Sequence, residues 1–154
     1  MEFLALNLSK LFAPDNIFFE LKSSSKNGVI EELIDLLVQA GRLRDREAAL
    51  RAILEREQKV STGMENGIAI PHGKTDSVDS LVVCLGVKRE GIDFASLDGQ
   101  PAQIFILTLS PSNRTGPHIQ FLAEITRILG ETAAREGILK ARSAEEVIDL
   151  LSRS

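Results

Sequence analysis

The sequence contains no tryptophan, no tyrosine and a single cysteine among its 154 residues. Without tryptophan and tyrosine, the chain lacks most of the aromatic side chains on which single-stranded nucleic acids stack. A formal net charge of -4 also argues against nucleic-acid binding, which requires a concentrated basic surface. The cysteine, Cys84, lies in the apolar run Leu81–Leu85, so we interpret it as a small buried residue rather than a redox or metal-binding group.

Long apolar runs are also missing, which argues against a membrane span or direct membrane insertion. The segment Met1–Phe12 lacks the basic start, the long apolar core and the cleavage site of a secretory signal, so we expect a cytoplasmic protein. The hydrophobic content of 44% and the charged content of 26% are typical of a globular protein. We therefore expect one domain over residues 1–154, which is long enough to bury a core of its own.

Helical spacing of apolar residues, with capping residues at the ends, predicts several helices. These are a short helix over Asn7–Phe12, a helix that begins at Ser24 or Ser25 and closes at Gly41, a helix from Asp45 to Glu57, a helix that begins near Gly116 with Pro117 in its first position, a short helix over Ala133–Lys140, and a last helix that begins at Ser143. The Ser143–Glu146 segment has a capping-box pattern.

Segments rich in β-branched and apolar residues predict the strands Asn16–Leu21, Ser80–Lys88 and Gln103–Leu109. The second and third are apolar throughout, so we place them inside a sheet that is covered on both faces. Turn residues between them predict that Lys88–Pro101 is a surface excursion. Helices and strands in mixed order predict an α/β fold with a central sheet and helices on its faces.

His72 is one of two histidines, and it lies at the end of a glycine-rich stretch. Pro71 fixes its own φ angle and favours an extended residue before it, whereas Gly73 has no side chain to crowd the imidazole. We expect the glycines at 63, 67 and 73 to let main-chain N–H groups turn toward an anion. The alternative is an ordinary loop histidine with one backbone hydrogen bond, but the pattern favours a histidine that accepts phosphoryl groups.

Attack on phosphorus requires one imidazole nitrogen of His72 to lack a proton. A hydrogen bond from the other nitrogen to a backbone carbonyl would ensure this, although the sequence does not say which nitrogen stays free. His118 is predicted to lie in the first turn of a helix, where the positive end of the dipole keeps the imidazole neutral and able to donate to a phosphoryl oxygen. Its alternative is a surface or capping histidine.

Arg56 is predicted to end the second long helix, next to the glycine-rich stretch, where its guanidinium can hold two phosphoryl oxygens. We interpret Lys59, Lys74 and Arg114 as ordinary solvated charges. Two distant histidines without further ligands do not form a metal site, and a nucleophile elbow is also missing. We therefore expect no metal and no cofactor.

The chain resembles the IIA components of the phosphoenolpyruvate-dependent sugar phosphotransferase system, in the mannitol and fructose class. The motifs that carry the resemblance are Glu55-Arg56-Glu57, Ser61-Thr62-Gly63 and Gly67–Lys74. Three further segments of the chain most resemble the nitrogen-related branch of this family: Gly91–Phe94, Leu97–Pro101 and Gly116-Pro117-His118.

The resemblance implies a mixed sheet between helices and a phosphorylated His72 that is modified on Nε2. It also implies that His118 is the second active-site histidine and Arg56 the active-site arginine, while Pro117 stands where the family more often has an acidic residue. The implied donor is HPr or a relative, which docks on an apolar surface. The hypotheses are a phosphoryl carrier with a nitrogen-regulatory role, a fructose or mannitol carrier that passes phosphate to a IIB cysteine, a phosphorylation-switched module that binds a regulatory protein, and a hydrolase.

Overall fold

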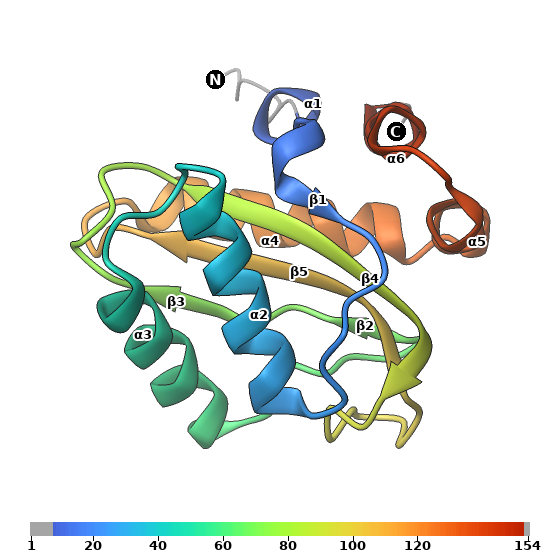
Figure 1. Ribbon diagram of the computed structural model, residues 1–154, viewed down its shortest axis with the longest axis horizontal. Coiled ribbons are helices and arrows are strands. Elements are labelled where there is room, and N and C mark those ends of the chain that lie inside the picture. The colour runs from blue at the N-terminus through green and yellow to red at the C-terminus, as the bar shows by residue number, and fades with distance from the viewer. Residues whose placement is uncertain (1–7, 153–154) are drawn as a thin grey trace.

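The computed structural model describes residues 8–152, which form a mixed sheet with helices on both faces (Figure 1). The helical elements are α1 (Leu8–Leu11), a 3-10 turn η1 (Pro14–Asn16), α2 (Lys26–Gln39), α3 (Arg46–Lys59), α4 (Thr115–Leu129), α5 (Thr132–Lys140) and α6 (Ala144–Ser152). The strands are β1 (Ile17–Phe18), β2 (Ile68–Ala69), β3 (His72–Lys74), β4 (Val82–Ile92) and β5 (Ala102–Ser110). The predicted α/β fold is confirmed.

Strand β5 lies inside the sheet, with β4 antiparallel on one side and β2 and β3 parallel on the other. Strand β1 pairs in parallel with the far side of β4. Strands β2 and β3 follow one another along the same edge of β5, with Ile68 opposite Ile104 and His72 opposite Thr108. Strands β2 and β3 are separated by a break that contains Pro71, which has no N–H to donate. This interrupted edge carries His72.

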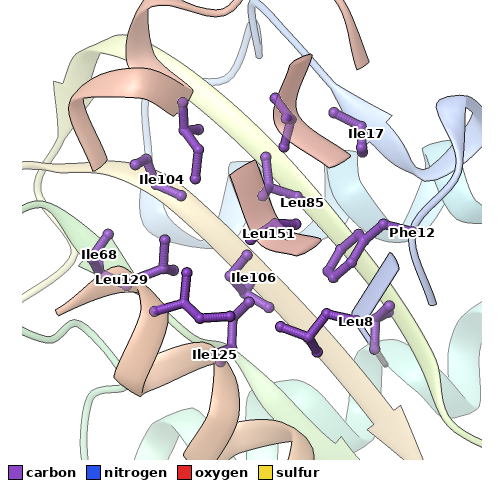
Figure 2. Close-up of a cluster of buried hydrophobic side chains, with 14 of the residues drawn as sticks. Leu8, Phe12, Ile17, Ile68, Leu85, Ile104, Ile106, Ile125, Leu129 and Leu151 are labelled. Atoms are coloured by element: carbon purple, nitrogen blue, oxygen red, sulfur yellow. The ribbon is translucent and has the colours of Figure 1, made fainter. Parts of the chain in front are cut away.

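Two apolar clusters fill the space between the sheet and its helices. Successive side chains of β5 alternate between them, because neighbouring strand residues point to opposite faces. Ile104 and Ile106 belong to the cluster beneath α4, part of which Figure 2 shows, and that cluster extends to α1, α5 and α6. Phe105 and Leu107 belong to the cluster beneath α2 and α3. The sheet is therefore buried on both faces, as the apolar composition of its long strands predicts.

Local capping residues fix the ends of the helices where the sequence predicts them. Ser25 Oγ accepts a hydrogen bond from Gly28 N at 3.1 Å, and Asp45 Oδ1 accepts one from Ala48 N at 3.0 Å. Gly41 takes a φ of 76° just after α2, in the left-handed region that glycine tolerates best. The predicted starts of α2 and α3 and the predicted end of α2 are confirmed.

Several boundaries differ from the predictions. Strand β1 covers only Ile17–Phe18 because Glu20 has a φ of 57°, which breaks the extended conformation. Strand β4 continues to Ile92 through an irregular register after Val87, and Phe94 is buried beyond it. The prediction that 88–101 is entirely a surface excursion is therefore wrong.

At the start of α4, Pro117 is the third residue and not the first. It is tolerated there because N–H groups of the first turn have no partner inside the helix. The predicted first helix is confirmed over Leu8–Leu11, whereas Asn7 lies outside the described residues. None of the helices described over residues 8–152 combines the length and the hydropathy that crossing a membrane requires.

Candidate functional site

A cleft of about 870 Å³ runs along the edge strand β3, between α3 and α4. It is lined by Ala52, Glu55, Arg56, Gln58, Lys59, His72, Gly73, Lys74, His118, Ile119 and Leu122. Because β3 is at the edge of the sheet, residues of α3 and α4, which cover opposite faces of the sheet (Figure 1), line the same cleft as His72. The cleft thus brings together the three residues that the sequence singles out, although they lie on three different elements.

His72 uses one ring nitrogen to hold its orientation. Its Nδ1 donates to the carbonyl oxygen of Ile70 at 2.8 Å, and Ile70 N donates to Thr62 O at 3.0 Å. The predicted bond to a backbone carbonyl is confirmed, and the structure identifies Nδ1 as the bonded nitrogen. Burial lowers the pKa of His72 below its ordinary value, and the charge of Arg56 lowers it further. His72 is therefore neutral near pH 7, with the Nε2 lone pair available.

His118 lies beside His72, with a distance of 5.5 Å between the ring centroids and an angle of 54° between the ring planes. Its side chain is buried, and its Nδ1 lies 2.8 Å from Ser110 Oγ. Burial lowers the pKa of His118 to about 4, with smaller contributions from His72 and Lys74. The expectation of a neutral imidazole is confirmed, but the largest cause is burial rather than the helix end.

Arg56 lies in the last turn of α3 and lines the cleft. Its Nη1 donates to the carbonyl oxygen of Val60 at 2.7 Å, which ties the guanidinium to the segment that follows the helix. Arg56 also contributes to the pKa of His72, so its positive charge lies close enough to act on the imidazole. Arg56 and His72 therefore share the cleft, and the positive charge of Arg56 acts on the imidazole.

The basic residues that the sequence analysis treats as solvated charges have different positions. Lys59 and Lys74 line the cleft, and Lys74 Nζ donates to Thr115 Oγ1 at 3.1 Å. Arg114 is the exposed N-cap residue of α4 and does not belong to the described lining. Lysines 59 and 74 therefore add positive charge to the cleft.

Sequence reasoning missed Glu57, a buried residue that is connected to His72 through hydrogen bonds. Its carboxylate accepts hydrogen bonds from the backbone N–H and the hydroxyl group of Thr62, and it forms an ion pair with Lys26 at 2.7 Å. Thr62 O in turn accepts the N–H of Ile70, whose own carbonyl holds His72. A chain of hydrogen bonds therefore connects the end of α3 with the orientation of the imidazole.

The glycines act differently from the expected N–H concavity. Gly63 N donates to Ser61 Oγ at 3.1 Å, so this N–H is used inside the protein and the expectation is wrong for it. Gly67 has a φ of 79°, a conformation that favours glycine. Gly73 is required for close packing, because a Cβ there would lie 2.9 Å from backbone atoms of Ala52.

Ser110 is a further residue that sequence reasoning missed. It ends β5, where Thr108 and Ser110 lie on alternate positions just after the apolar run Ile104–Leu107. Polar residues at that spacing point to the same face, which was the available signal. Over residues 8–152, histidine, cysteine, aspartate and glutamate form no group of three or more that is placed to hold a metal ion.

Comparison with known proteins identifies relatives over almost the whole chain. Residues 10–154 match the family model described as "Phosphoenolpyruvate-dependent sugar phosphotransferase system, EIIA 2". The fructose-specific EIIA component of the phosphotransferase system (PTS) of Haloferax volcanii is 40% identical over 146 residues, which cover 95% of each chain. The fructose-specific EIIABC component of Bacillus subtilis is 34% identical over 148 residues, and the chain spans only 23% of that relative's length.

Solved structures show the same fold. The nitrogen regulatory protein IIA-Ntr from Neisseria meningitidis superposes with a TM-score of 0.83 at 28% identity, over 94% of this chain and 98% of that one. The mannitol enzyme IIA from Escherichia coli, in a complex with phosphorylated mannitol enzyme IIB, superposes with a TM-score of 0.79 at 27% identity, over 93% and 98% of the two chains. The chain therefore belongs to the EIIA type 2 family, whose members are phosphocarrier components of the phosphoenolpyruvate-dependent sugar phosphotransferase system.

Proposed function

We propose that His72 accepts a phosphoryl group on Nε2 from an HPr-type phosphocarrier and passes it to a IIB cysteine. The observation that carries the proposal is the hydrogen bond of 2.8 Å between His72 Nδ1 and Ile70 O, which commits one nitrogen to the backbone and leaves the other for chemistry. In the transfer, the Nε2 lone pair forms a bond to phosphorus. The bond between phosphorus and the donor's histidine nitrogen breaks, and that nitrogen keeps the electron pair. Ile70 O stabilises the positive charge that develops on the ring.

Arg56 and His118 are proposed to hold the phosphoryl oxygens. Both line the cleft with His72, and phosphoryl transfer depends mainly on positioning and on neutralising the charge of the transferred group. A guanidinium supplies paired N–H donors, whereas a neutral imidazole supplies one. Lys59 and Lys74 strengthen the positive potential of the cleft. The apolar rim includes Ile119 and Leu122, which suits a protein partner better than a small polar substrate.

The onward acceptor is proposed to be a IIB domain because the Escherichia coli mannitol IIA was solved in complex with phosphorylated IIB. The Haloferax relative carries the name of a fructose-specific component, which supports sugar uptake as the route. A nitrogen-regulatory function is the second candidate, and it rests on the structural similarity to the Neisseria IIA-Ntr. In that case the phosphorylated and unphosphorylated forms bind different regulatory proteins.

The test is incubation with a phosphorylated HPr-type carrier, followed by measurement of the intact mass. We expect a stable gain of one acid-labile phosphoryl group in the wild type and none in His72→Gln, whose fold is checked by circular dichroism. Rapid release of free phosphate would instead support a hydrolase. Addition of a IIB domain then separates the two carrier functions, because loss of the phosphoryl group to the IIB cysteine supports transport. Retention of the group, with phosphorylation-dependent capture of another protein, supports regulation.

A further inference from the structure

Ser110 lies next to the proposed phosphoryl site without lining the cleft. It is the last residue of β5, is fully buried, and pairs in register with Lys74. Side chains of β5 at even-numbered positions, such as Ile104 and Ile106, face the cluster beneath α4, so Ser110 faces the same side. There its Oγ lies 2.8 Å from Nδ1 of His118. The serine therefore contacts Nδ1 of His118. The other ring nitrogen, Nε2, is the one that would donate to a phosphoryl oxygen in the proposed function.

The direction of this hydrogen bond follows from the burial of both groups. A neutral imidazole has one N–H and one lone pair, whereas a hydroxyl group can donate or accept. Over residues 8–152, the bond to His118 is the one hydrogen bond that Ser110 Oγ makes. If Nδ1 were the donor, the hydroxyl proton of Ser110 would be buried without an acceptor, which is unfavourable. Donation from Ser110 to the Nδ1 lone pair satisfies both groups.

We infer that Ser110 is a positioning residue that donates its hydroxyl proton to His118 Nδ1 and so holds the hydrogen of the His118 ring on Nε2. The inference rests on the proposed function, in which His118 donates to a phosphoryl oxygen on His72. With the opposite tautomer, His118 presents a lone pair at Nε2, which repels an anionic oxygen. Ser110 therefore acts on the transferred group only through His118, by selecting the form of the ring that can donate.

A matched control lies on the same strand and the same face. Thr108 is also fully buried, and its Oγ1 has no hydrogen-bond partner among the described residues. Thr108→Val removes a buried hydroxyl group while preserving the shape of the side chain, and it leaves the contact between Ser110 and His118 in place. Ser110→Ala removes the hydroxyl group that makes the contact, and Ser110→Thr keeps a hydroxyl group at that position.

The experiment measures the nitrogen-15 chemical shifts of the His118 ring in the full chain near neutral pH, for the wild type and the three variants. We expect protonated Nε2 and unprotonated Nδ1 in the wild type, in Ser110→Thr and in Thr108→Val. Ser110→Ala is expected to show a mixture of tautomers. A wild-type His118 that is protonated on Nδ1 would overturn the inference, as would an unchanged pattern in Ser110→Ala or an equal change in Thr108→Val.

Phosphoryl uptake from the phosphorylated HPr-type donor provides the second readout. We expect Ser110→Ala to slow uptake roughly tenfold, less than the loss of a direct donor causes, and Ser110→Thr to restore most of the rate. An unchanged rate in Ser110→Ala, with normal uptake by the wild type, would overturn the inference alone. Failure of the wild type to accept any phosphoryl group would overturn the proposed function, whereas the tautomer measurement would still decide how Ser110 and His118 are bonded.

Discussion

Gly73 packs directly against the backbone of Ala52, so that a Cβ at residue 73 would lie 2.9 Å from both the carbonyl carbon and the carbonyl oxygen of Ala52. This contact holds β3 against α3, and the same three-residue strand carries His72. The distance between α3 and the strand that carries His72 is therefore set by the absence of a side chain at residue 73. Backbone atoms cannot rotate away as a flexible side chain would, so a substitution at this position must move a whole element.

We predict that Gly73→Ala lowers the free energy of unfolding by about 1–3 kcal/mol, because overpacking forces backbone shifts of that cost. Urea denaturation measures the change. Gly116→Ala in α4 is the matched control, since its Cβ would meet no atom within 4 Å. Alanine is favoured over glycine within a helix, so this variant should be unchanged or more stable by up to about 1 kcal/mol. Equal stability of the two variants would contradict the role of the contact.

Removal of His118 tests the second histidine of the cleft. We predict that His118→Ala slows phosphoryl uptake by roughly a hundredfold while the fold is retained, as expected for the loss of one preorganised donor. The measurement is the rate of transfer from a phosphorylated HPr-type donor, followed by intact mass. Kinetics equal to those of the wild type would exclude His118 from the site.

Arg56 is predicted to contribute both charge and paired hydrogen bonds. Arg56→Ala should slow uptake by about ten- to a thousandfold, and Arg56→Lys should recover only part of the rate because an ammonium group lacks the planar fork. The control is Arg51→Ala, which removes an exposed arginine from the same helix. A similar loss in Arg51→Ala would indicate a general effect of charge on the association of the donor instead of a specific contact.

Stability should fall as the solution is acidified, and His118 should account for part of the fall. Burial holds the pKa of His118 at about 4 in the folded chain, whereas an unfolded histidine titrates near about 6.5. Between these two pKa values the unfolded state binds more protons than the folded state, so the free energy of unfolding rises with pH. The contribution of His118 to stability is therefore lost as the pH falls toward about 4. We predict a flatter pH profile for His118→Gln than for the wild type in urea denaturation. Parallel profiles would contradict the shift.

The buried carboxylate of Glu57 should be more important for stability than its exposed neighbour. We predict that Glu57→Ala lowers the free energy of unfolding by about 2–4 kcal/mol, because it leaves Thr62 and Lys26 without their partner. Glu55→Ala, at an exposed position of the same helix, should change it by less than about 0.5 kcal/mol. Comparable losses in the two variants would show that the hydrogen bonds to Thr62 contribute little.

The parts of the fold that depend on local interactions were predictable from the sequence. Capping residues such as Ser25 and Asp45 act within one helical turn. The mainly apolar composition of β5 is enough to predict that this strand is buried. The bulged end of β4 was not predictable, because its turn residues resemble a loop, whereas Ile92 and Phe94 are buried in a cluster with residues from distant segments such as Phe105.

The candidate site shows the same limit. His72, His118 and Arg56 could be singled out from their neighbours in the sequence and from the family resemblance, and the cleft contains all three. The contact of Ser110 with His118 depends on how α4 packs against the end of β5, which a local pattern does not encode. The close packing of Gly63 and Gly73 was not predictable for the same reason, since their close neighbours come from other segments.

The hydrogen bond from His72 Nδ1 to Ile70 O joins residues only two positions apart. It leaves Nε2 as the one ring nitrogen that Ile70 does not hold, on a side chain that lines the cleft. In the proposed function, the protein that donates the phosphoryl group and the protein that accepts it must therefore bind at the same cleft. With His72 as the proposed acceptor, we expect a ping-pong exchange, in which the donor protein dissociates before the acceptor protein binds. The rate of such an exchange would then depend on how fast each partner protein dissociates, so that weak and rapidly reversible binding is an advantage.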